Sequence, residues 1–285
     1  MIDRKPQGRA VLGGAIVDSE ALLLSWSDPA AQWGLGAFET VAVRDALPRH
    51  LEEHLVRLGG AARRLGLPLP AEAELIRAVR AVAAGTPGGR AWLKILVSRS
   101  GQWTVFAGLL DPADEGRPVS AVVLPWRRHR LDPTVGIKSV GYAGAILGLE
   151  EARRRGADEG FWLNDRGHVT ESCTGNVFVA RGRAVVTPAL RDGARDGVTR
   201  ARAIAALRGF GLSVRQSKVR IATLRAADEI FLTSSLRGVR PVVRIDGRNV
   251  RRGDPGPISR RLSEHLILDD ARYDVVAHRD DRRGA

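Results

Sequence analysis

Lysine is rare in this sequence, so each lysine is a candidate for chemistry rather than for charge alone. The chain of 285 residues has 45 lysines and arginines, but only four are lysines, namely Lys5, Lys94, Lys138 and Lys218. An amine can lose its proton and attack a carbonyl group, whereas a guanidinium stays protonated. Schiff-base formation is the commonest reaction that requires such an amine. A lysine nucleophile is therefore the first chemical hypothesis.

Lys138 is the best candidate because of the elements that follow it. Residues 143–155 have helical character, and the short apolar runs 161–164 and 168–171 flank an Asp-Arg-Gly turn. The second run ends at Glu171. The order is thus lysine, helix, hairpin and glutamate.

Lys94 is the rival nucleophile. It alternates with Trp92 and Leu96 on a predicted strand over residues 90–98, and no comparable acidic motif follows it. We therefore expect Lys94 to have a structural role or to lie at a surface edge.

The segment around Lys138 and Glu171 resembles the fold-type IV pyridoxal-phosphate enzymes. These include branched-chain aminotransferases, D-amino-acid aminotransferases and 4-amino-4-deoxychorismate lyases. Their Lys-Ser/Thr-x-Asn-Tyr-like motif is similar to Lys138 to Tyr142, with Gly141 in place of asparagine, and their Thr-Glu-x-x-x-x-Asn-x-Phe motif matches Thr170 to Phe178. The resemblance implies pyridoxal 5'-phosphate as cofactor. It also implies Lys138 and Glu171 as the catalytic residues, with Glu171 at the pyridine nitrogen.

Two further motifs in the first half of the chain extend the resemblance. The run Gly34 to Thr40 is similar to the family's Gly-Asp-Gly-x-Phe-Glu-Thr motif, with Leu35 in place of aspartate. On the predicted helix that follows, His50 and His54 are four residues apart, but no third ligand is nearby and we expect no metal. The resemblance assigns Arg57 to the cofactor phosphate, which suits a fork of donors.

Two motifs in the second half resemble the family's phosphate seats. Gly197-Val198-Thr199-Arg200 opens a predicted helix, whose N-terminus favours anions. The predicted strand ending at Thr233 runs into hydroxyl side chains. The resemblance implies cofactor binding by Arg57, Tyr142, Glu171, Asn176, Val198, Thr199, Thr233 and Ser234, and substrate binding by Phe38, Arg99, Arg195 and Ser235.

Within the family, the motifs favour 4-amino-4-deoxychorismate lyase, which releases pyruvate and 4-aminobenzoate, a folate precursor. Phe38-Glu39-Thr40 and the run from Thr233 to Val242 look more like the lyases than like the branched-chain enzymes. The lyases' Arg-Gly-Tyr loop is absent, and Ser100 to Trp103 stands there instead. A D-amino-acid or branched-chain transaminase is the alternative.

The polar stretch 111–118, with two prolines and a glycine, is the best predicted linker. We expect an N-terminal α+β domain over residues 1–117 and a C-terminal α/β domain over residues 118–285 that carries Lys138, with the cofactor between them. The resemblance implies a fold-type IV structure and a homodimer.

The composition limits the partners. No apolar run reaches the ~20 residues of a membrane helix, and the start of the chain lacks the pattern of a signal peptide, so we expect a cytoplasmic protein. The net charge of +13 comes from arginines spread along the chain without any nucleic-acid-binding motif. We expect a small amine or amino-acid substrate and no nucleic acid, with a basic polyanion-binding protein as the remote alternative.

Overall fold

The predicted strands and helices assemble into two units, each with its own apolar core. The computed structural model describes residues 6, 8–22, 25–86 and 88–281. The first unit comprises Met1–Pro112 and Ile137–Tyr142, and the second comprises Ala113–Gly136 and Ala143–Ala285. This agrees with the expected two-domain architecture of α+β and mixed α/β parts.

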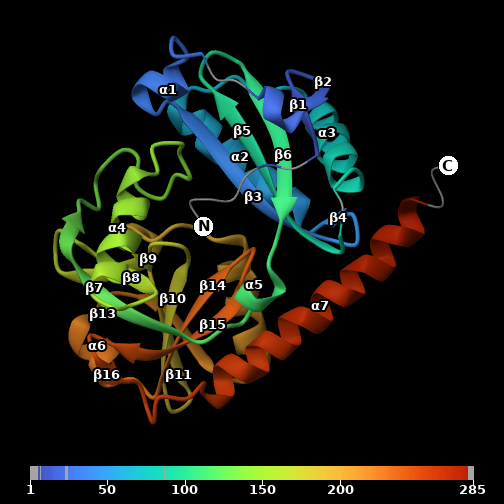
Figure 1. Cartoon of the computed structure of the whole chain (residues 1–285). Helices are drawn as coiled ribbons and strands as arrows, with labels where there is room; N and C mark the ends of the chain where they lie inside the picture. Colours follow the sequence, from blue (N-terminus) through green and yellow to red (C-terminus); the bar gives the residue numbers. More distant parts are fainter. Residues whose placement is uncertain (1–5, 7, 23–24, 87, 282–285) are drawn as a thin grey trace. The chain divides into compact units, whose positions relative to one another are not determined.

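The first unit is built on a six-stranded sheet in which every pairing is antiparallel (Figure 1). Its strands are β1 (Arg9–Leu12), β2 (Ala15–Asp18), β3 (Gly36–Arg44), β4 (Leu47–Pro48), β5 (Arg90–Ser98) and β6 (Trp103–Leu109). The order across the sheet is β2-β1-β6-β5-β3-β4.

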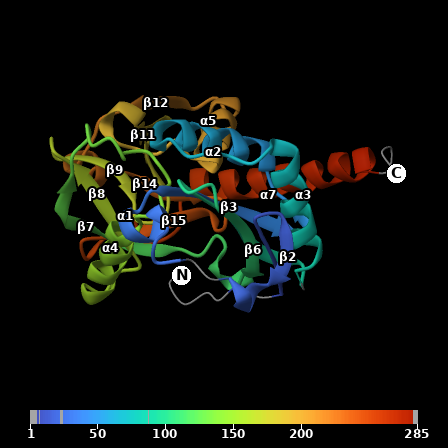
Figure 2. The same ribbon diagram turned by 90° about the horizontal axis from the view of Figure 1, so that it is seen from above.

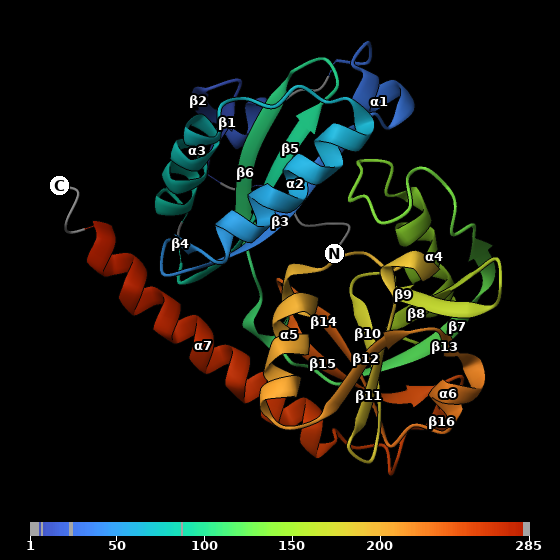
Figure 3. The ribbon, with the colours of Figure 1, turned by 180° about the vertical axis from the view of Figure 1, so that it is seen from behind.

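Helices α2 (Leu51–Leu65) and α3 (Glu72–Ala84) cover one face of this sheet, as Figures 2 and 3 show. The apolar stripe of α2 buries Leu51, Leu55 and Leu58 against the sheet. Helix α2 ends at Gly66, whose left-handed conformation (φ 64°) suits a residue without Cβ. The remaining elements are the 3-10 turn η1 (Ser19–Ala21) and the short helix α1 (Pro29–Trp33).

Strand alternation sends neighbouring residues of β3 to opposite faces of the sheet. Glu39 lies among the core residues under the helices and is only 1% exposed. Phe38 and Thr40 belong to the other face, where Thr40 is paired with Lys94 of β5. This separation puts a buried carboxylate and an aromatic ring on the two sides of a single strand.

The segment that carries Lys138 packs with the first unit, which corrects the expected domain assignment. A β-bridge joins Ser139 to Ala37, and the backbone N–H of Phe38 donates to the carbonyl of Lys138 at 2.9 Å. The N–H of Val140 donates to Gly36 at 3.0 Å. Backbone pairing with β3 therefore places Lys138 beside the first sheet, although its neighbours in sequence belong to the second unit.

The second unit contains a ten-stranded mixed sheet. Its strands are β7 (Val119–Arg128), β8 (Glu159–Asn164), β9 (His168–Ser172), β10 (Asn176–Arg181), β11 (Ala184–Pro188), β12 (Ser213–Ser217), β13 (Val219–Arg220), β14 (Glu229–Ser234), β15 (Gly238–Ile245) and β16 (Arg248–Asn249). The order is β12-β11-β10-β14-β15-β7-β8-β9-β13, with β16 beside β15. Strands β15, β7 and β8 run parallel, as do β11 and β12.

Four helices and two 3-10 turns complete the second unit, with η2 at its boundary. They are η2 (Pro112–Asp114), α4 (Ala143–Arg154), η3 (Leu190–Asp192), α5 (Val198–Gly209), α6 (Ile221–Arg225) and α7 (Pro257–Asp281). Phe178 and Phe231 stack at 5.1 Å on the sheet face where Leu207 of α5 and Leu262 of α7 are buried. Among the described residues, no helix is both long and apolar enough to cross a membrane.

Candidate active site

Lys138 is held against an aromatic pair in the first unit. Its Nζ lies 4.1 Å from the ring centroid of Phe38 and 5.2 Å from that of Tyr142. The two rings meet edge to face at 5.3 Å. Because the carbonyl of Lys138 also accepts the N–H of Phe38, Phe38 fixes both the backbone and the amine of the lysine. The structure thus brings together the predicted residues Phe38, Lys138 and Tyr142.

Lys94 shares the same ring, which sequence reasoning missed. Its Nζ lies 5.0 Å from the ring centroid of Phe38 and 5.8 Å from that of Phe106. The side chain is half-buried, and burial lowers the pKa of its ammonium group. No carboxylate pairs with Lys94 in the part of the chain that the structure describes. A desolvated cation without a counter-ion favours an anionic ligand.

Arg57 is fixed by a buried carboxylate on the helix side of the sheet. Its Nε donates to Oε1 of Glu39 at 2.7 Å, and its Nη2 donates to Oε2 at 2.6 Å. His54 Nδ1 lies 2.8 Å from the same Oε2. Burial by itself would raise the pKa of Glu39, but hydrogen bonds from Arg57 and His54 and the charge of Arg57 outweigh it and lower the pKa to about 2.

The protonation of this cluster follows from the charges. Burial lowers the pKa of His54, and the charges of Arg57 and Lys138 add to this effect against the opposing effect of Glu39. His54 is therefore neutral near pH 7. Since an ionised carboxylate can only accept, the proton of His54 sits on Nδ1 and is donated to Glu39. The result is a rigid, bidentate mount for the Arg57 guanidinium.

In the second unit, Glu171 stands near the end of β9 and is 7% exposed. Arg128 Nη1 donates to its Oε1 at 3.1 Å, and Arg195 Nη2 lies 3.6 Å from the same oxygen. Within the described residues no donor is recorded on the other oxygen, Oε2. Two guanidinium groups thus approach Oε1, while Oε2 can accept a hydrogen bond from a ring N–H.

Arg128 and Arg195 both belong to the surroundings of Glu171. The guanidinium of Arg128 stacks on Trp162, with its Cζ 4.0 Å from a ring centroid. The resemblance predicted that Arg195 binds the substrate. In the structure its guanidinium lies beside the carboxylate of Glu171. The carbonyl of Arg195 accepts a hydrogen bond from Asn176 Nδ2 at 2.8 Å.

The N-terminus of α5 lies directly against Asn176. A Cβ added at Gly197 would lie 2.0 Å from Asn176 Oδ1, so only glycine fits there. Gly197 is the N-cap residue, and no side chain of the described residues caps the helix, which leaves the N–H groups of its first turn, around Val198 and Thr199, for another acceptor. Together with the helix dipole they suit an anion.

Thr233 supplies a second donor in the same unit. It pairs with Asn176 across β10 and β14, and it is 1% exposed. Its Oγ1 is buried and has no hydrogen-bond partner among the described residues. Gly175 packs so closely on the carbonyl of Thr233 that an added Cβ would approach it to 2.7 Å. An unsatisfied hydroxyl and an uncapped helix fit the phosphate of pyridoxal phosphate.

The other residues predicted to bind cofactor or substrate lie outside these clusters. Arg99 is exposed, and its guanidinium lies beside Gly66 at the C-terminal end of α2, where the helix dipole favours a cation. The structure therefore does not bring Arg99 to Phe38. Ser234 and Ser235 are half-buried after Thr233. No group of three metal-ligating side chains occurs among residues 6, 8–22, 25–86 and 88–281.

Four residues of the site were not predicted to belong to it, namely Glu39, His54, Lys94 and Arg128. A signal existed for Glu39 and His54, since Glu39 follows Phe38 on a buried strand and His54 lies one helical turn before Arg57. Arg128 had no such signal, because only the folded sheet brings β7 to the end of β9.

Comparisons with known proteins show what the chain as a whole is similar to. The family described as amino-transferase class IV matches residues 36–245. A protein of Methanocaldococcus jannaschii, provisionally named a branched-chain-amino-acid aminotransferase, is 28% identical over 272 residues, which cover 89% of this chain and 93% of that protein. Other relatives with a branched-chain-amino-acid aminotransferase name match over about half of their length, 50% and 52%.

Two solved structures share the fold. A hypothetical aminotransferase of Mycobacterium tuberculosis, in a form with bound alpha-ketoglutarate and PMP, superposes with a TM-score of 0.82 at 25% identity and covers 90% of this chain and 96% of that one. A protein of Legionella pneumophila, provisionally called 4-amino-4-deoxychorismate lyase, superposes with a TM-score of 0.80 at 26% identity, covering 89% and 98%.

Proposed function

Because the chain belongs to the amino-transferase class IV family, whose cofactor is pyridoxal phosphate, we propose that it transfers amino groups between an amino acid and a keto acid. We further propose that one of these substrates carries a second carboxylate, as glutamate does. The single observation that carries this choice is Lys94, a half-buried ammonium group that shares the Phe38 ring with Lys138 and has no acidic partner among the described residues.

Lys138 holds the cofactor and moves the proton. Bound pyridoxal phosphate supplies an aldehyde that captures the substrate amine and a ring that accepts the electron pair left when a proton departs. With its amine free, Lys138 would take that proton from the substrate carbon that bears the nitrogen. Its position over Phe38 and beside Tyr142 restricts the directions in which the amine can point.

The remaining residues hold the cofactor at its two ends. Glu171 would hold the pyridine end of the cofactor through Oε2, since Arg128 and Arg195 approach Oε1. At the phosphate end, Thr233 supplies its unsatisfied hydroxyl and Ser234 follows it. The first N–H groups of α5 belong to the same set of donors, and the family resemblance adds the guanidinium of Arg57 in the first unit.

Names of relatives support transfer over elimination. The Methanocaldococcus relative that matches along nearly its whole length has an aminotransferase name. The Mycobacterium structure holds a keto acid with two carboxylates together with the aminated cofactor. Both observations favour an aminotransferase over the lyase that the sequence motifs favoured.

The lyase is the second candidate. It is favoured by the run from Phe38 to Thr40, by the run from Thr233 to Val242 and by the Legionella structure. Its substrate is also a dianion, so Lys94 would serve it equally well.

Substitution of Lys94 tests the substrate class. In Lys94→Met the KM for glutamate should rise about tenfold or more, since a charge-assisted contact contributes about 1.5–3 kcal/mol. The KM for leucine should stay near the wild-type value. Lys218→Met, which removes an exposed lysine, is the matched control. An unchanged KM for glutamate would remove Lys94 from the substrate site.

Two assays separate transfer from elimination. Glutamate, D-alanine or L-leucine added without a keto acid should change the absorption band of the bound cofactor, and a keto acid should restore it. If all three fail while 4-amino-4-deoxychorismate alone yields 4-aminobenzoate and pyruvate, the protein is a lyase.

A further inference from the structure

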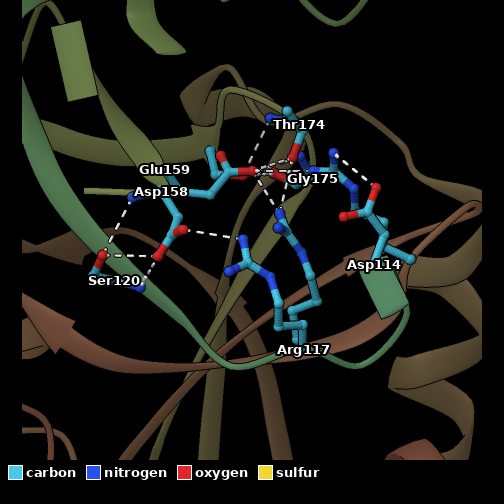
Figure 4. A network of polar contacts seen from close by, with 10 residues as sticks. Asp114, Arg117, Ser120, Asp158, Glu159, Thr174 and Gly175 are labelled. Atoms are coloured by element: carbon cyan, nitrogen blue, oxygen red, sulfur yellow. Dashed lines mark hydrogen bonds and ion pairs between the residues drawn. The ribbon is translucent and has the colours of Figure 1, made fainter. Parts of the chain in front are cut away.

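A buried ion pair lies behind the turn that follows Glu171, and the proposed chemistry does not use it. Glu159 of β8 is fully buried, and its Oε1 accepts a hydrogen bond from Thr174 Oγ1 (Figure 4). The same Oε1 accepts a hydrogen bond from Arg240 Nη2. Arg240 Nη2 also lies 3.0 Å from Thr174 Oγ1. Arg240 itself is 4% exposed. Three side chains from β8, β15 and the turn thus meet at one point.

A more exposed part of the network surrounds this core. Arg237 Nη1 lies 3.9 Å from Glu159 Oε1, and its Nη2 lies 3.9 Å from Asp114. Asp158 accepts hydrogen bonds from Ser120 at 2.8 Å and from Arg117 at 3.0 Å. Arg117 is 54% exposed in its side chain, and no contact with Thr174 is recorded for it, so it offers a matched control.

Stability is a poor explanation for the buried pair. Glu159 Oε2 and Arg240 Nε are buried and have no hydrogen-bond partner among the described residues. Burying a charged pair that is only partly satisfied costs desolvation energy, and apolar or neutral replacements of such pairs are often neutral or stabilising. The pair therefore calls for a role other than stability.

Thr174 is the link between the ion pair and the cofactor site. It lies in the turn between Glu171 of β9 and Asn176 of β10. The next residue, Gly175, packs on the carbonyl of Thr233, and Asn176 packs on Gly197 at the start of α5. This short turn therefore connects directly to Glu171 and contacts both proposed phosphate-binding elements, Thr233 and the N-terminus of α5.

We propose that Glu159 and Arg240 are positioning residues that act through Thr174. They fix the turn, and the turn sets the distance between Glu171 and the phosphate donors Thr233 and α5. This inference rests on the roles proposed above for Glu171 and Thr233, but not on which amino donor the enzyme uses.

The test compares cofactor affinity with stability in the same variants. The double variant Glu159→Gln/Arg240→Met removes both charges of the pair, and Arg237, which also lies near Glu159, keeps its ion pair with Asp114. Its apo form should melt at the wild-type temperature or above, while its dissociation constant for pyridoxal phosphate rises about tenfold, which corresponds to about 1.4 kcal/mol. The absorption maximum of the bound cofactor should shift, because Glu171 moves relative to the ring.

A second variant keeps the proposal testable if the double variant does not fold. Thr174→Val leaves the ion pair in place and removes only the hydroxyl that it holds. It should weaken cofactor binding by a similar factor, and adding it to the double variant should weaken binding no further, since all three residues act along one path. Arg117→Met should bind the cofactor as the wild type does.

The outcomes separate this inference from the proposed function. If Glu171→Gln and Thr233→Val weaken cofactor binding but Thr174→Val and the double variant do not, the positioning role is wrong and the proposed site stands. If Glu171→Gln and Thr233→Val also bind like the wild type, the proposed site is wrong. A double variant that loses stability and cofactor together, with Thr174→Val unchanged, would assign the ion pair to folding alone.

Discussion

At the scale of single residues, charge pairing around Glu39 determines how the stability of the folded protein depends on pH. In the folded protein the pKa of Glu39 is lowered from its ordinary value of 4.5 to about 2, so the carboxylate stays ionised over most of this range. Between these values the unfolded chain binds a proton that the folded protein does not, so stability falls as the pH falls through this window.

The first prediction follows from this difference. Glu39→Gln should lose stability at pH 7 but should show a shallower loss between pH 5 and pH 2 than the wild type does. Urea unfolding midpoints at several pH values measure both effects. Parallel pH profiles for the two proteins would show that Glu39 titrates normally in the folded state.

The second prediction concerns the phosphate donors. Arg57→Ala should weaken cofactor binding by about 1.5–3 kcal/mol, the range for hydrogen bonds to charged groups. Thr233→Val removes one neutral hydroxyl and should cost less, about 0.5–1.5 kcal/mol. Equilibrium dialysis of pyridoxal phosphate gives both values. Wild-type binding in Arg57→Ala would mean that the bidentate pairing with Glu39 is its only role.

At the scale of elements, close packing between a turn and a helix start defines the phosphate end of the site. Asn176 fills the space where any side chain at Gly197 would project. The helix N-terminus and strand β10 are consequently held at a fixed separation, which a single methyl group would disturb.

The third prediction uses two glycines of the same helix. Gly197→Ala should reduce cofactor binding and lower the melting temperature, because the methyl group forces Asn176 or the first turn of α5 to move. Gly209→Ala is the matched control at the other end of α5, where an added Cβ meets nothing within 4 Å. It should be neutral or stabilising by up to about 1 kcal/mol. Equal behaviour of the two variants would contradict the packing argument.

At the scale of the whole molecule, the family resemblance implies a homodimer. The fourth prediction is that light scattering of the active enzyme gives twice the mass of the 30.8 kDa chain. The exposed side chains of Trp26 and Trp33, 86% and 74% accessible in this single chain, give a spectroscopic check. Their fluorescence should shift to shorter wavelength at concentrations where the dimer forms if they are buried in it. An active monomer would contradict the expectation.

The sequence by itself predicted most of the elements and indicated the candidate site residues. Periodicity located the strands and helices that flank Lys138 and Glu171, because local patterns of apolar residues reflect local structure. The polar strand β12 (Ser213–Ser217) was not predicted, since its largely exposed residues carry no apolar alternation and only its partner β11 makes it a strand. The motifs also predicted Thr233 and the α5 N-terminus at positions where the structure has an unsatisfied hydroxyl and an uncapped helix.

Only the tertiary structure decided which charges meet. Lys138 packs with the first unit because its backbone pairs with β3, which no local pattern reveals. Lys94 looked like an edge residue on its strand, yet the register of three strands places it on the ring that also carries Lys138. Arg128 and Arg240 reach Glu171 and Glu159 from distant parts of the sequence. Contacts between residues far apart in the chain depend on sheet order and register, and these arise only when the whole chain buries its apolar faces together.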